Sequence, residues 1–232
     1  MSLPLIMIAT AVVALALGRL TAWPTIRSLR TQLADATWSM LHDPLTGMLN
    51  RAGLQAAHAN LADTTPAQPI LVALIDLDDF KHINDTHGHD QGDDLLIHVG
   101  QRITDIAALH GGAAARLAGD EYAALLPART GDVDRIADAI VTIIAQPVAL
   151  PANGSSPAPV TIAASVGLAL VDTNDPFAEV ALHRADVAMY HAKRNGRNRH
   201  AIYQPGMTMP PAPHRRGPRL RDRHQPTGEA TA

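Results

Sequence analysis

The sequence contains no cysteine, few aromatic residues and almost no lysine. The absence of cysteine excludes a disulfide scaffold, thiol catalysis and Cys-ligated zinc, and it suits a reducing compartment. Aromatic residues make up 3 % of the chain, which disfavours a nucleic-acid module that stacks bases on rings. The two lysines, Lys81 and Lys193, stand among 17 arginines. Either chance or a need for a compact point charge at these positions explains this bias.

Charge is unevenly distributed along the 232 residues. The net charge is -3 overall, but residues 43–203 carry -8, whereas residues 1–42 and 204–232 are both net positive. An acidic central region argues against nucleic acid as a partner and suits a site that gathers metal cations. Hydrophobic residues make up 47 % of the sequence, enough to build the core of one ordinary domain.

The N-terminal segment, residues 1–23, is predicted to be a transmembrane anchor. Its first 18 residues carry no charge, and a helix over most of the segment would be about 30 Å long, the thickness of a hydrocarbon core. Arg19 would extend its charge toward the membrane surface, and Trp23 would lie at the interface. No basic residue precedes or interrupts the uncharged run, and all of them follow it, which predicts a single-pass protein of the inner (cytoplasmic) membrane with its C-terminal bulk in the cytoplasm. A cleaved signal peptide, or a chain without an anchor, is the alternative.

Residues 24–41 are predicted to form a helical stalk. Apolar residues recur there at near-helical spacing: Ile26, Leu29, Leu33, Trp38 and Leu41. Such a helix either pairs with a second copy of itself or packs on its own domain. At the other end of the chain, residues 204–232 are rich in proline and arginine and are predicted to be a disordered tail.

The central region, residues 42–203, is predicted to be one α/β domain. A continuous apolar run over 70–75 indicates a buried strand that ends at Asp76. The pattern then predicts a helix that begins after Asp93 or Asp94, a hairpin, a helix, a strand and a further helix. The later elements are expected near 113–126, 133–143, 160–171 and 175–194, with a Gly/Ser/Pro loop at 151–159. This order predicts an α+β sandwich in which helices flank a central, mostly antiparallel sheet.

Three polar clusters are candidates for chemistry. An acidic stretch, 76–81, follows the first strand, two acids lie at the tip of the predicted hairpin, 116–122, and a basic stretch, 193–199, ends the last helix. Carboxylates on neighbouring strands would form the oxygen-rich group that hard metal ions prefer. Cations at a helix end either hold phosphate oxygens or complement the helix dipole. For the side chains of Asp78 and Asp79 alone, a solvated acidic turn is the simpler interpretation.

Four sequence blocks resemble the GGDEF-domain diguanylate cyclases. They are DPLTGMLNR at 43–51, DLDDFKHINDTHGHDQGDDLL at 76–96, RLAGDEY at 116–122 and ADVAMYHAKRNGRNR at 185–199. The resemblance covers about residues 40–203 and implies the fold of nucleotidyl cyclases and polymerase palm domains. It implies a reaction in which a homodimer condenses two GTP molecules into cyclic di-GMP and pyrophosphate, with each subunit binding one GTP.

The same resemblance implies a role for individual residues. Two Mg²⁺ or Mn²⁺ ions per active site would bind to Asp76, the Leu77 carbonyl and Asp120. Catalytic roles would fall to Glu121, Asp120 and Lys193, with Glu121 supporting metal binding or activation of the attacking hydroxyl. The substrate-binding residues would be Asn84 and Asp93 for guanine, and the backbone of Asp79 and Phe80 with the side chains of Lys81, Lys193 and Arg197 for phosphates.

The chain departs from the family pattern at several positions. Ala118 stands in place of the first glycine of the signature and Tyr122 in place of its phenylalanine, and both changes are expected to be tolerated. The family's inhibitory product site needs an R-x-x-D sequence, but Leu109 and Gly112 occupy those positions, so no such site is expected. The alternative to an active enzyme is a catalytically silent GGDEF module that binds GTP as a regulator or scaffold at the membrane. The retained acids favour the enzyme.

Overall fold

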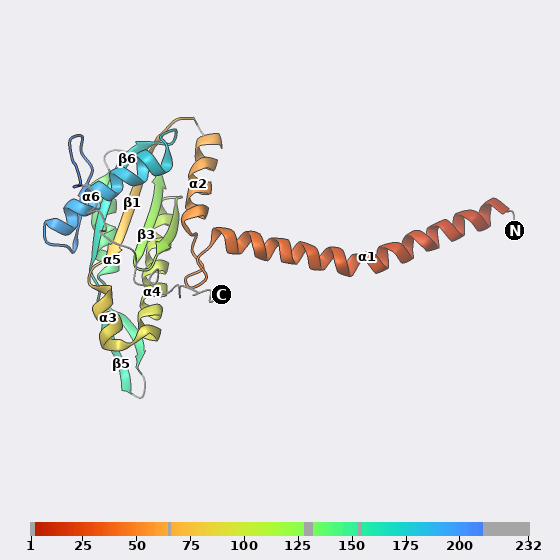
Figure 1. Ribbon diagram of the computed structural model, residues 1–232, viewed down its shortest axis with the longest axis horizontal. Coiled ribbons are helices and arrows are strands. Elements are labelled where there is room, and N and C mark those ends of the chain that lie inside the picture. Colours follow the sequence, from red (N-terminus) through yellow and green to blue (C-terminus); the bar gives the residue numbers. More distant parts are fainter. Residues whose placement is uncertain (1–2, 65, 128–131, 153–154, 211–232) are drawn as a thin grey trace, which may run out of the picture.

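The computed structural model describes residues 3–64, 66–127, 132–152 and 155–210 (Figure 1). The first elements are α1 (Leu3–Leu41), α2 (Arg51–Thr64), β1 (Pro69–Leu77), α3 (Phe80–His87), α4 (His89–Leu109), β2 (Ala113–Ala118) and β3 (Glu121–Pro127). They are followed by α5 (Val133–Ile144), β4 (Val148–Ala152), β5 (Ser155–Val160), β6 (Ala164–Asp172), the π-helical segment η2 (Phe177–Leu182), α6 (His183–Arg194) and β7 (Arg199–Ile202).

Five strands form the central sheet in the order β2-β3-β1-β6-β7. β1 lies in the middle and is antiparallel to both β3 and β6, while β2 pairs antiparallel with β3 and β7 pairs parallel with β6. The middle position explains the uninterrupted apolar run over 70–75, because side chains on both faces of this strand are covered by other elements. The predicted α+β architecture, a mostly antiparallel sheet with flanking helices, is confirmed.

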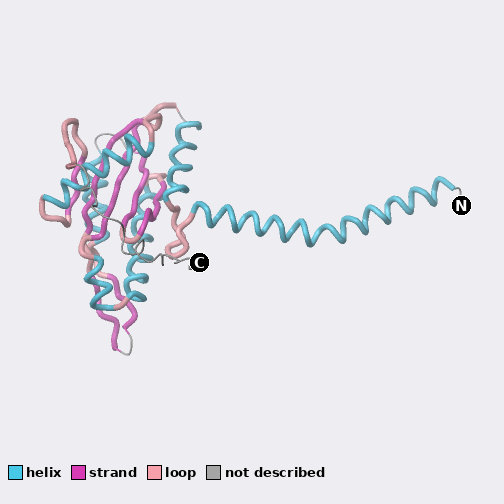
Figure 2. The backbone as a smooth tube through the Cα atoms, viewed as in Figure 1, coloured by secondary structure: helices cyan, strands magenta, loops and turns pink. Residues whose placement is uncertain are grey.

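Helices cover both faces of the sheet (Figures 1 and 2). α4 and α5 pack on one face, where the odd-numbered residues of β1 from 71 to 77 join a hydrophobic cluster. α2, η2 and α6 pack on the other face, where the even-numbered residues from 70 to 74 join a second cluster. Because successive side chains of a strand point to opposite faces, Asp76 continues the even-numbered row and lies on the α2/α6 face.

The segment predicted as a Gly/Ser/Pro loop, 151–159, instead belongs to a hairpin. β4 and β5 pair antiparallel in a small second sheet. Val148, Leu150 and Val160 are at most 7 % exposed and join the cluster on the α4/α5 face. Burial of these alternate side chains outweighs the weak strand propensity of the proline and serine around them. The strand predicted to begin at residue 160 begins only at Ala164, after this hairpin has ended.

α4 also begins earlier than predicted, at His89 instead of after Asp93 or Asp94. Gly88 precedes it with φ 89°, a conformation that glycine adopts without steric cost. This glycine reverses the chain between α3 and α4, so both helices are complete right up to the turn. The helix predicted over 175–194 is formed, but its first part is the π-helical η2.

α1 is one continuous helix of 39 residues that projects away from the sheet (Figure 1). Pro24 lies inside it, so the expected boundary between an anchor over 1–23 and a stalk over 24–41 does not interrupt the helix. The uncharged run stops at Arg19, and the helix continues through a polar stretch. Among the described residues no helix is long and apolar enough to cross a membrane, and the predicted transmembrane anchor is not supported.

The C-terminal tail was predicted to be disordered from residue 204. Residues 204–210 contain no helix or strand, but they return to α6, where His191 Nε2 lies 3.1 Å from the Thr208 carbonyl oxygen. Residues 211–232, which contain all the arginines of the tail, lie outside the described residues. For them, disorder stays a prediction.

α6 packs closely on β6 at Gly167. A Cβ atom at this position would lie 2.1 Å from the Ala185 carbonyl oxygen and 2.2 Å from the Met189 nitrogen, far inside normal contact distances. The missing side chain therefore lets the backbone of α6 rest directly on the sheet. This approach also sets how far the last turn of α6, with Lys193, lies from the end of β1.

Gly167→Ala is expected to lower the free energy of unfolding by about 1–3 kcal/mol, because α6 must move away from β6 to accommodate the methyl group. Urea unfolding of the full chain, followed by circular dichroism, measures the change. Gly18→Ala is the matched control, since a Cβ atom there meets nothing within 4 Å. A Gly167 variant as stable as the wild type would contradict this packing.

Candidate active site

Asp76 and Glu121 face each other across the middle of the sheet. The antiparallel register of β1 and β3 sets Asp76 directly opposite Glu121. The Leu77 N–H donates to the Asp120 carbonyl oxygen at 3.2 Å. This bond joins the end of β1 to the turn between β2 and β3, residues 118–121, which we call the signature turn. Directly opposed residues of adjacent strands have Cβ atoms about 5 Å apart on the same face. The two acids therefore project together from the α2/α6 face, while Asp120 occupies the turn itself.

The last turn of α6 brings Lys193 to the same carboxylate. Its Nζ lies 2.8 Å from Asp76 Oδ2, so two of the predicted site residues are in direct contact. Burial raises the pKa of Asp76 above its ordinary value. The lysine opposes this effect, and the negative charges of Asp120 and Asp78 add to it. The carboxylate is thus costly to ionise even with its lysine partner in place.

Glu121 is in a similar position. Burial raises its pKa, and the negative charge of Asp76 raises it further, against the opposing charges of Lys193 and Arg51. Neighbouring carboxyls with raised pKa values destabilise each other as anions, and a bound cation relieves that repulsion. The Asp76–Glu121 pair is therefore an electrostatic site for a cation.

The donor set fits a metal ion that arrives with a phosphate ligand. Within the described ranges, no three His, Cys, Asp or Glu side chains lie close enough to form a metal site on their own. Mg²⁺ usually keeps several waters and binds through one or two protein carboxylates together with substrate phosphates. Asp76 and the neighbouring Asp120, whose charge acts on Asp76, can supply those carboxylates, with Glu121 beside them, so the residues present suit such an ion.

The Asp78 side chain is a structural tie, and the prediction of a solvated turn is wrong for it. Only 6 % of this side chain is exposed. It accepts a hydrogen bond from Ser165 Oγ at 2.7 Å and another from the Asn198 N–H at 2.9 Å. Arg197 and Asn198 adopt left-handed backbone conformations, with φ 58° and 46°. These contacts fold the loop after α6 onto the β1–α3 turn and place Arg197 Nε 3.9 Å from Asp78 Oδ1.

The N-terminus of α3 presents backbone N–H groups beside this turn. Asp79 precedes the helix in a left-handed conformation, φ 56°, and its side chain makes no capping hydrogen bond. The first N–H groups of the helix, including that of Phe80, are therefore not occupied by a capping side chain. Asp79 is 71 % exposed, as the solvated-turn interpretation predicts, and its Oδ1 lies 3.5 Å from Arg197. Lys81 is different: its side chain is 90 % exposed, and its Nζ lies 4.0 Å from Asp85 Oδ2.

The predicted guanine-binding residues lie close together at the α3–α4 junction. Asn84 is half-buried on α3. If Gly92 had a Cβ atom, that atom would lie only 1.9 Å from Asn84 Oδ1, too close for both to fit. Asp93 is the next residue of α4 and is exposed. The glycine, to which the sequence analysis gave no role, thus makes room for the amide of Asn84 next to Asp93.

The signature turn is held from behind by the first sequence block. Arg116 donates through Nε to the Gly119 carbonyl oxygen at 2.8 Å and through Nη1 to Asp43 Oδ1 at 2.9 Å. Asp43 Oδ1 also accepts from the backbone and hydroxyl of Thr46. The chain just after α1 is therefore connected to the signature turn through a largely buried ion pair.

The two departures within the signature cause no strain. Ala118 does not have a positive φ, whereas Gly119 has φ 53°. The left-handed position of the turn is thus the one that keeps its glycine, and a methyl group at 118 costs little. The Tyr122 side chain is fully buried, and its hydroxyl donates to the Leu96 carbonyl oxygen at 2.8 Å. Burial of the phenol raises its pKa, so it remains a neutral donor.

The positions of the family's product site contain no charged side chain. Leu109 is 84 % exposed at the end of α4. Gly112 is enclosed: a Cβ atom there would lie 2.1 Å from the Leu125 carbonyl oxygen. The lack of an inhibitory product site stays a prediction, and the packing at 112 is compatible with it.

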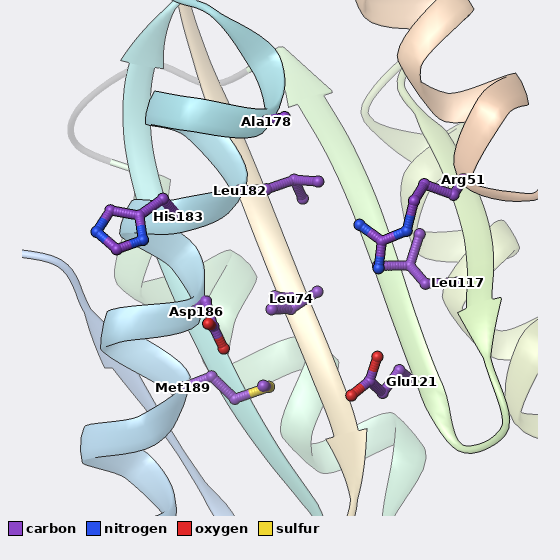
Figure 3. A pocket seen from close by; sticks show the side chains of 9 residues that line it. All are labelled: Arg51, Leu74, Leu117, Glu121, Ala178, Leu182, His183, Asp186 and Met189. Carbon is purple, nitrogen blue, oxygen red and sulfur yellow. The ribbon is translucent and has the colours of Figure 1, made fainter. Parts of the chain in front are cut away.

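A pocket of about 320 Å³ adjoins Glu121 on the α2/α6 face (Figure 3). Arg51, His183 and Asp186 line it together with Glu121, and none of these three was assigned a role from the sequence. Arg51 ends the first of the four sequence blocks and Asp186 lies within the last one, so their positions inside these blocks were the available signal. Their separation along the chain concealed that they line one pocket.

Comparison with known proteins decides the family. The family described as "Diguanylate cyclase, GGDEF domain" matches residues 40–199. The chain belongs to this family. Among curated relatives, it is 36 % identical to the bifunctional diguanylate cyclase/cyclic di-GMP phosphodiesterase MucR of Pseudomonas aeruginosa, over 87 % of this chain and 30 % of MucR. It is also 36 % identical to the diguanylate cyclase TpbB of the same species, over 78 % of this chain and 41 % of TpbB.

Solved structures agree with this assignment. The coiled coil and GGDEF domain of DgcB from Caulobacter crescentus, in complex with c-di-GMP, matches with a TM-score of 0.68 and 27 % identity. That match covers 82 % of this chain and 99 % of the DgcB chain. The GGDEF domain of TpbB from Pseudomonas aeruginosa matches with a TM-score of 0.58 and 35 % identity, over 70 % of this chain and 94 % of that one. The chain spans less than half the length of MucR and TpbB themselves.

Asp43→Asn is expected to lower the free energy of unfolding at neutral pH by about 1–3 kcal/mol, because the buried Arg116 loses its charged acceptor. Burial acts to raise the pKa of Asp43, but the hydrogen bonds from Thr46 and Arg116 outweigh it, so the pKa lies below its ordinary value of 3.8. A lowered folded-state pKa stabilises the fold above the unfolded-state pKa, and that contribution disappears as pH falls through the folded-state value.

The difference in stability between wild type and Asp43→Asn should therefore be largest near pH 7 and should shrink below about pH 4. Urea unfolding at several pH values measures it. Asp63→Asn, which changes an exposed carboxylate on α2, is the control and should follow the wild type at every pH. A constant difference across this range would show that the charge of Asp43 is not responsible.

Proposed function

We propose that this chain is a diguanylate cyclase, which condenses two GTP molecules into cyclic di-GMP and releases pyrophosphate. The observation that carries the proposal is the opposed pair Asp76 and Glu121 with Lys193 in contact at the end of the central strand. These three residues all lie within the part of the chain that matches the family. A silent module that only binds GTP would need carboxylates for the metal ion that accompanies the phosphates, but it would need no further acid to accept a proton from an attacking hydroxyl.

In the proposed reaction, the 3′-oxygen of one GTP bonds to the α-phosphorus of the other, and the bond from that phosphorus to the pyrophosphate oxygen breaks. Glu121 accepts the hydroxyl proton, a role that its raised pKa suits. Two Mg²⁺ or Mn²⁺ ions, held by Asp76, Asp120 and the Leu77 carbonyl, would neutralise the phosphate charge when bound. The residues of the chain contribute mainly by position, since phosphoryl transfer depends on alignment and charge neutralisation.

Phosphate binding is assigned to the turn after β1 and the end of α6. No side chain caps the N–H groups of Asp79 and Phe80. They lie at the N-terminus of α3, where free N–H groups and the helix dipole favour an anion such as a phosphate. Arg197 is held beside this turn by the loop that Asp78 ties down. When GTP binds, Lys193 leaves Asp76, which it contacts in this structure, and pairs with the β- and γ-phosphates. Lys81 joins them by leaving Asp85.

Guanine binding is assigned to Asn84 and Asp93. A carboxylate accepts hydrogen bonds from both N1–H and the exocyclic amine of guanine, and adenine lacks this donor pair. The fit of the Asn84 amide over Gly92 supports the assignment, because it fixes one polar group beside the exposed carboxylate of Asp93. The site accordingly selects GTP over ATP.

Assembly as a homodimer is supported by α1. Its exposed apolar side chains include Ile26, Leu29, Leu33 and Met40, with exposed fractions of 44 to 71 %. Their spacing of three, four and seven residues is the heptad pattern of a coiled coil. A second copy of α1 would cover this stripe and hold two GGDEF domains near each other, which raises their effective concentration. The DgcB structure, described as a coiled coil with a GGDEF domain, is consistent with this arrangement.

The full chain with GTP and Mg²⁺ is expected to release pyrophosphate and form cyclic di-GMP. Asp120→Asn keeps the shape of the side chain and removes its charge, so turnover should fall on the order of 100-fold or more while the fold survives. Chromatography of the nucleotide products measures turnover, and circular dichroism checks the fold. Asp63→Asn is again the control and should retain full turnover.

Two outcomes would contradict parts of this proposal. Near-normal turnover by the Asp120 variant would remove that residue from the site. GTP binding by the wild type without any cyclic di-GMP, at protein concentrations that allow dimers, would instead identify the chain as a silent regulatory module.

Leu33→Glu in the middle of the α1 stripe is expected to raise the dimer dissociation constant at least tenfold, about 1.4 kcal/mol, because it places a charge in the apolar seam. Sedimentation equilibrium of the full chain measures this constant. Thr31→Glu changes the same helix outside the stripe and should leave it unaltered. Equal dissociation constants for both variants would show that the two copies do not associate through this stripe.

A further inference from the structure

The pocket beside Glu121 contains a mixture of opposite charges over an apolar floor (Figure 3). Arg51 enters it from the start of α2, and Asp186 and His183 enter it from α6. The floor and walls are apolar and are formed by Leu74, Leu117, Ala178, Leu182 and Met189. Its volume of about 320 Å³ is within the range of ligand pockets.

Three features lie in one row: the pocket, the acid pair Asp76–Glu121, and the turn after β1 to which phosphate binding is assigned. Along β1, Leu74 lines the pocket, Asp76 belongs to the acid pair and Asp78 begins the turn assigned to phosphate. The order along α6 is the same, because Asp186 of the pocket precedes Lys193 by seven residues, or about two turns. Glu121 belongs both to the pocket and to the acid pair.

This order has a consequence for an in-line reaction. The attacking oxygen and the leaving oxygen lie on opposite sides of the phosphorus. With pyrophosphate on the side of Arg197 and the α-phosphate at the acid pair, the attacking hydroxyl arrives from the side of the pocket. In the proposed reaction, which joins two GTP molecules, that hydroxyl belongs to the nucleotide of a second copy.

The chemistry of the pocket suits a ribose. Two carboxylates, Glu121 and Asp186, disfavour a phosphate group, while the guanine base is already assigned to Asn84 and Asp93. Ribose is neutral, and each of its hydroxyls both donates and accepts a hydrogen bond. Asp186 can accept from such a hydroxyl and Arg51 can donate to one, and the C–H edges of the ring can pack on the apolar floor.

We propose that this pocket receives the ribose of the GTP held by a second copy of the chain, with Arg51 and Asp186 as its hydrogen-bonding partners. The inference rests on the proposed function and adds a sugar specificity to it. In 2′-deoxy-GTP the 2′-hydroxyl is missing, so Arg51 and Asp186 would lose a hydrogen-bonding partner. We therefore expect 2′-deoxy-GTP to be a poor substrate.

The first test is a ratio of specificities in the full chain. The wild type should prefer GTP over 2′-deoxy-GTP in kcat/KM by at least about tenfold, and Asp186→Asn and Arg51→Ala should reduce this preference toward one. Binding of 3′-deoxy-GTP, which cannot attack, should be unchanged in both variants, because its base and phosphates lie elsewhere. Glu179→Gln, in η2 and outside the pocket lining, should keep the wild-type preference. A preference retained by both pocket variants would overturn the inference and leave the proposed function intact.

The second test does not depend on turnover. Met189 lines the pocket, and 13C-methyl labelling of methionine gives its methyl group an NMR signal. With Mg²⁺ and α,β-methylene-GTP, which retains its ribose but cannot be cleaved, this signal should shift, and 2′,3′-dideoxy-GTP should leave it in place. A shift in a chain without turnover would refute the proposed function and keep the ribose pocket. No shift with either nucleotide would refute the pocket.

Discussion

The geometry of the site depends on the register between β1 and β3. Since side chains alternate between the two faces of a strand, a slip of one residue would turn Glu121 toward the α4/α5 core and separate it from Asp76. That slip would also bury a carboxyl among apolar side chains and remove the neighbouring Tyr122, which is fully buried in this register, from the α4/α5 core. The core therefore enforces the register, and the register in turn forces two acids together despite their repulsion.

The surrounding loops are held by side chains whose partners are distant in sequence. Asp78 connects the turn after β1 to β6 and to the loop after α6, and Arg116 connects the signature turn to Asp43. Each contact joins a charged group to a partly buried partner, which makes it stronger than an exposed pair. The rigid sheet positions the acids, while these contacts position the cations and backbone amides around them.

The architecture was predictable where patterns are local. The apolar run at 70–75 and the spacing of the later helices indicated the central strand and its flanking helices, and four sequence blocks indicated the candidate site. The β4–β5 hairpin was missed because proline and serine conceal the alternation of Val148 and Leu150. The buried role of Asp78 could not be inferred, since its partners Ser165 and Asn198 are 87 and 120 residues away. The pocket was missed for the same reason, as its lining comes from separate segments.

The packing at Gly112 restricts which residues the chain can accept at this position. Its neighbour across the strands leaves no space for even one methyl group, because a Cβ atom would meet the Leu125 carbonyl oxygen at 2.1 Å. Introducing the family's R-x-x-D motif would thus need a displacement of the β2–β3 backbone besides new residues at 109 and 112. Substitutions at 109 and 112 alone would therefore not create such a site in this chain, and its introduction by design would require the β2–β3 hairpin to be repacked as well.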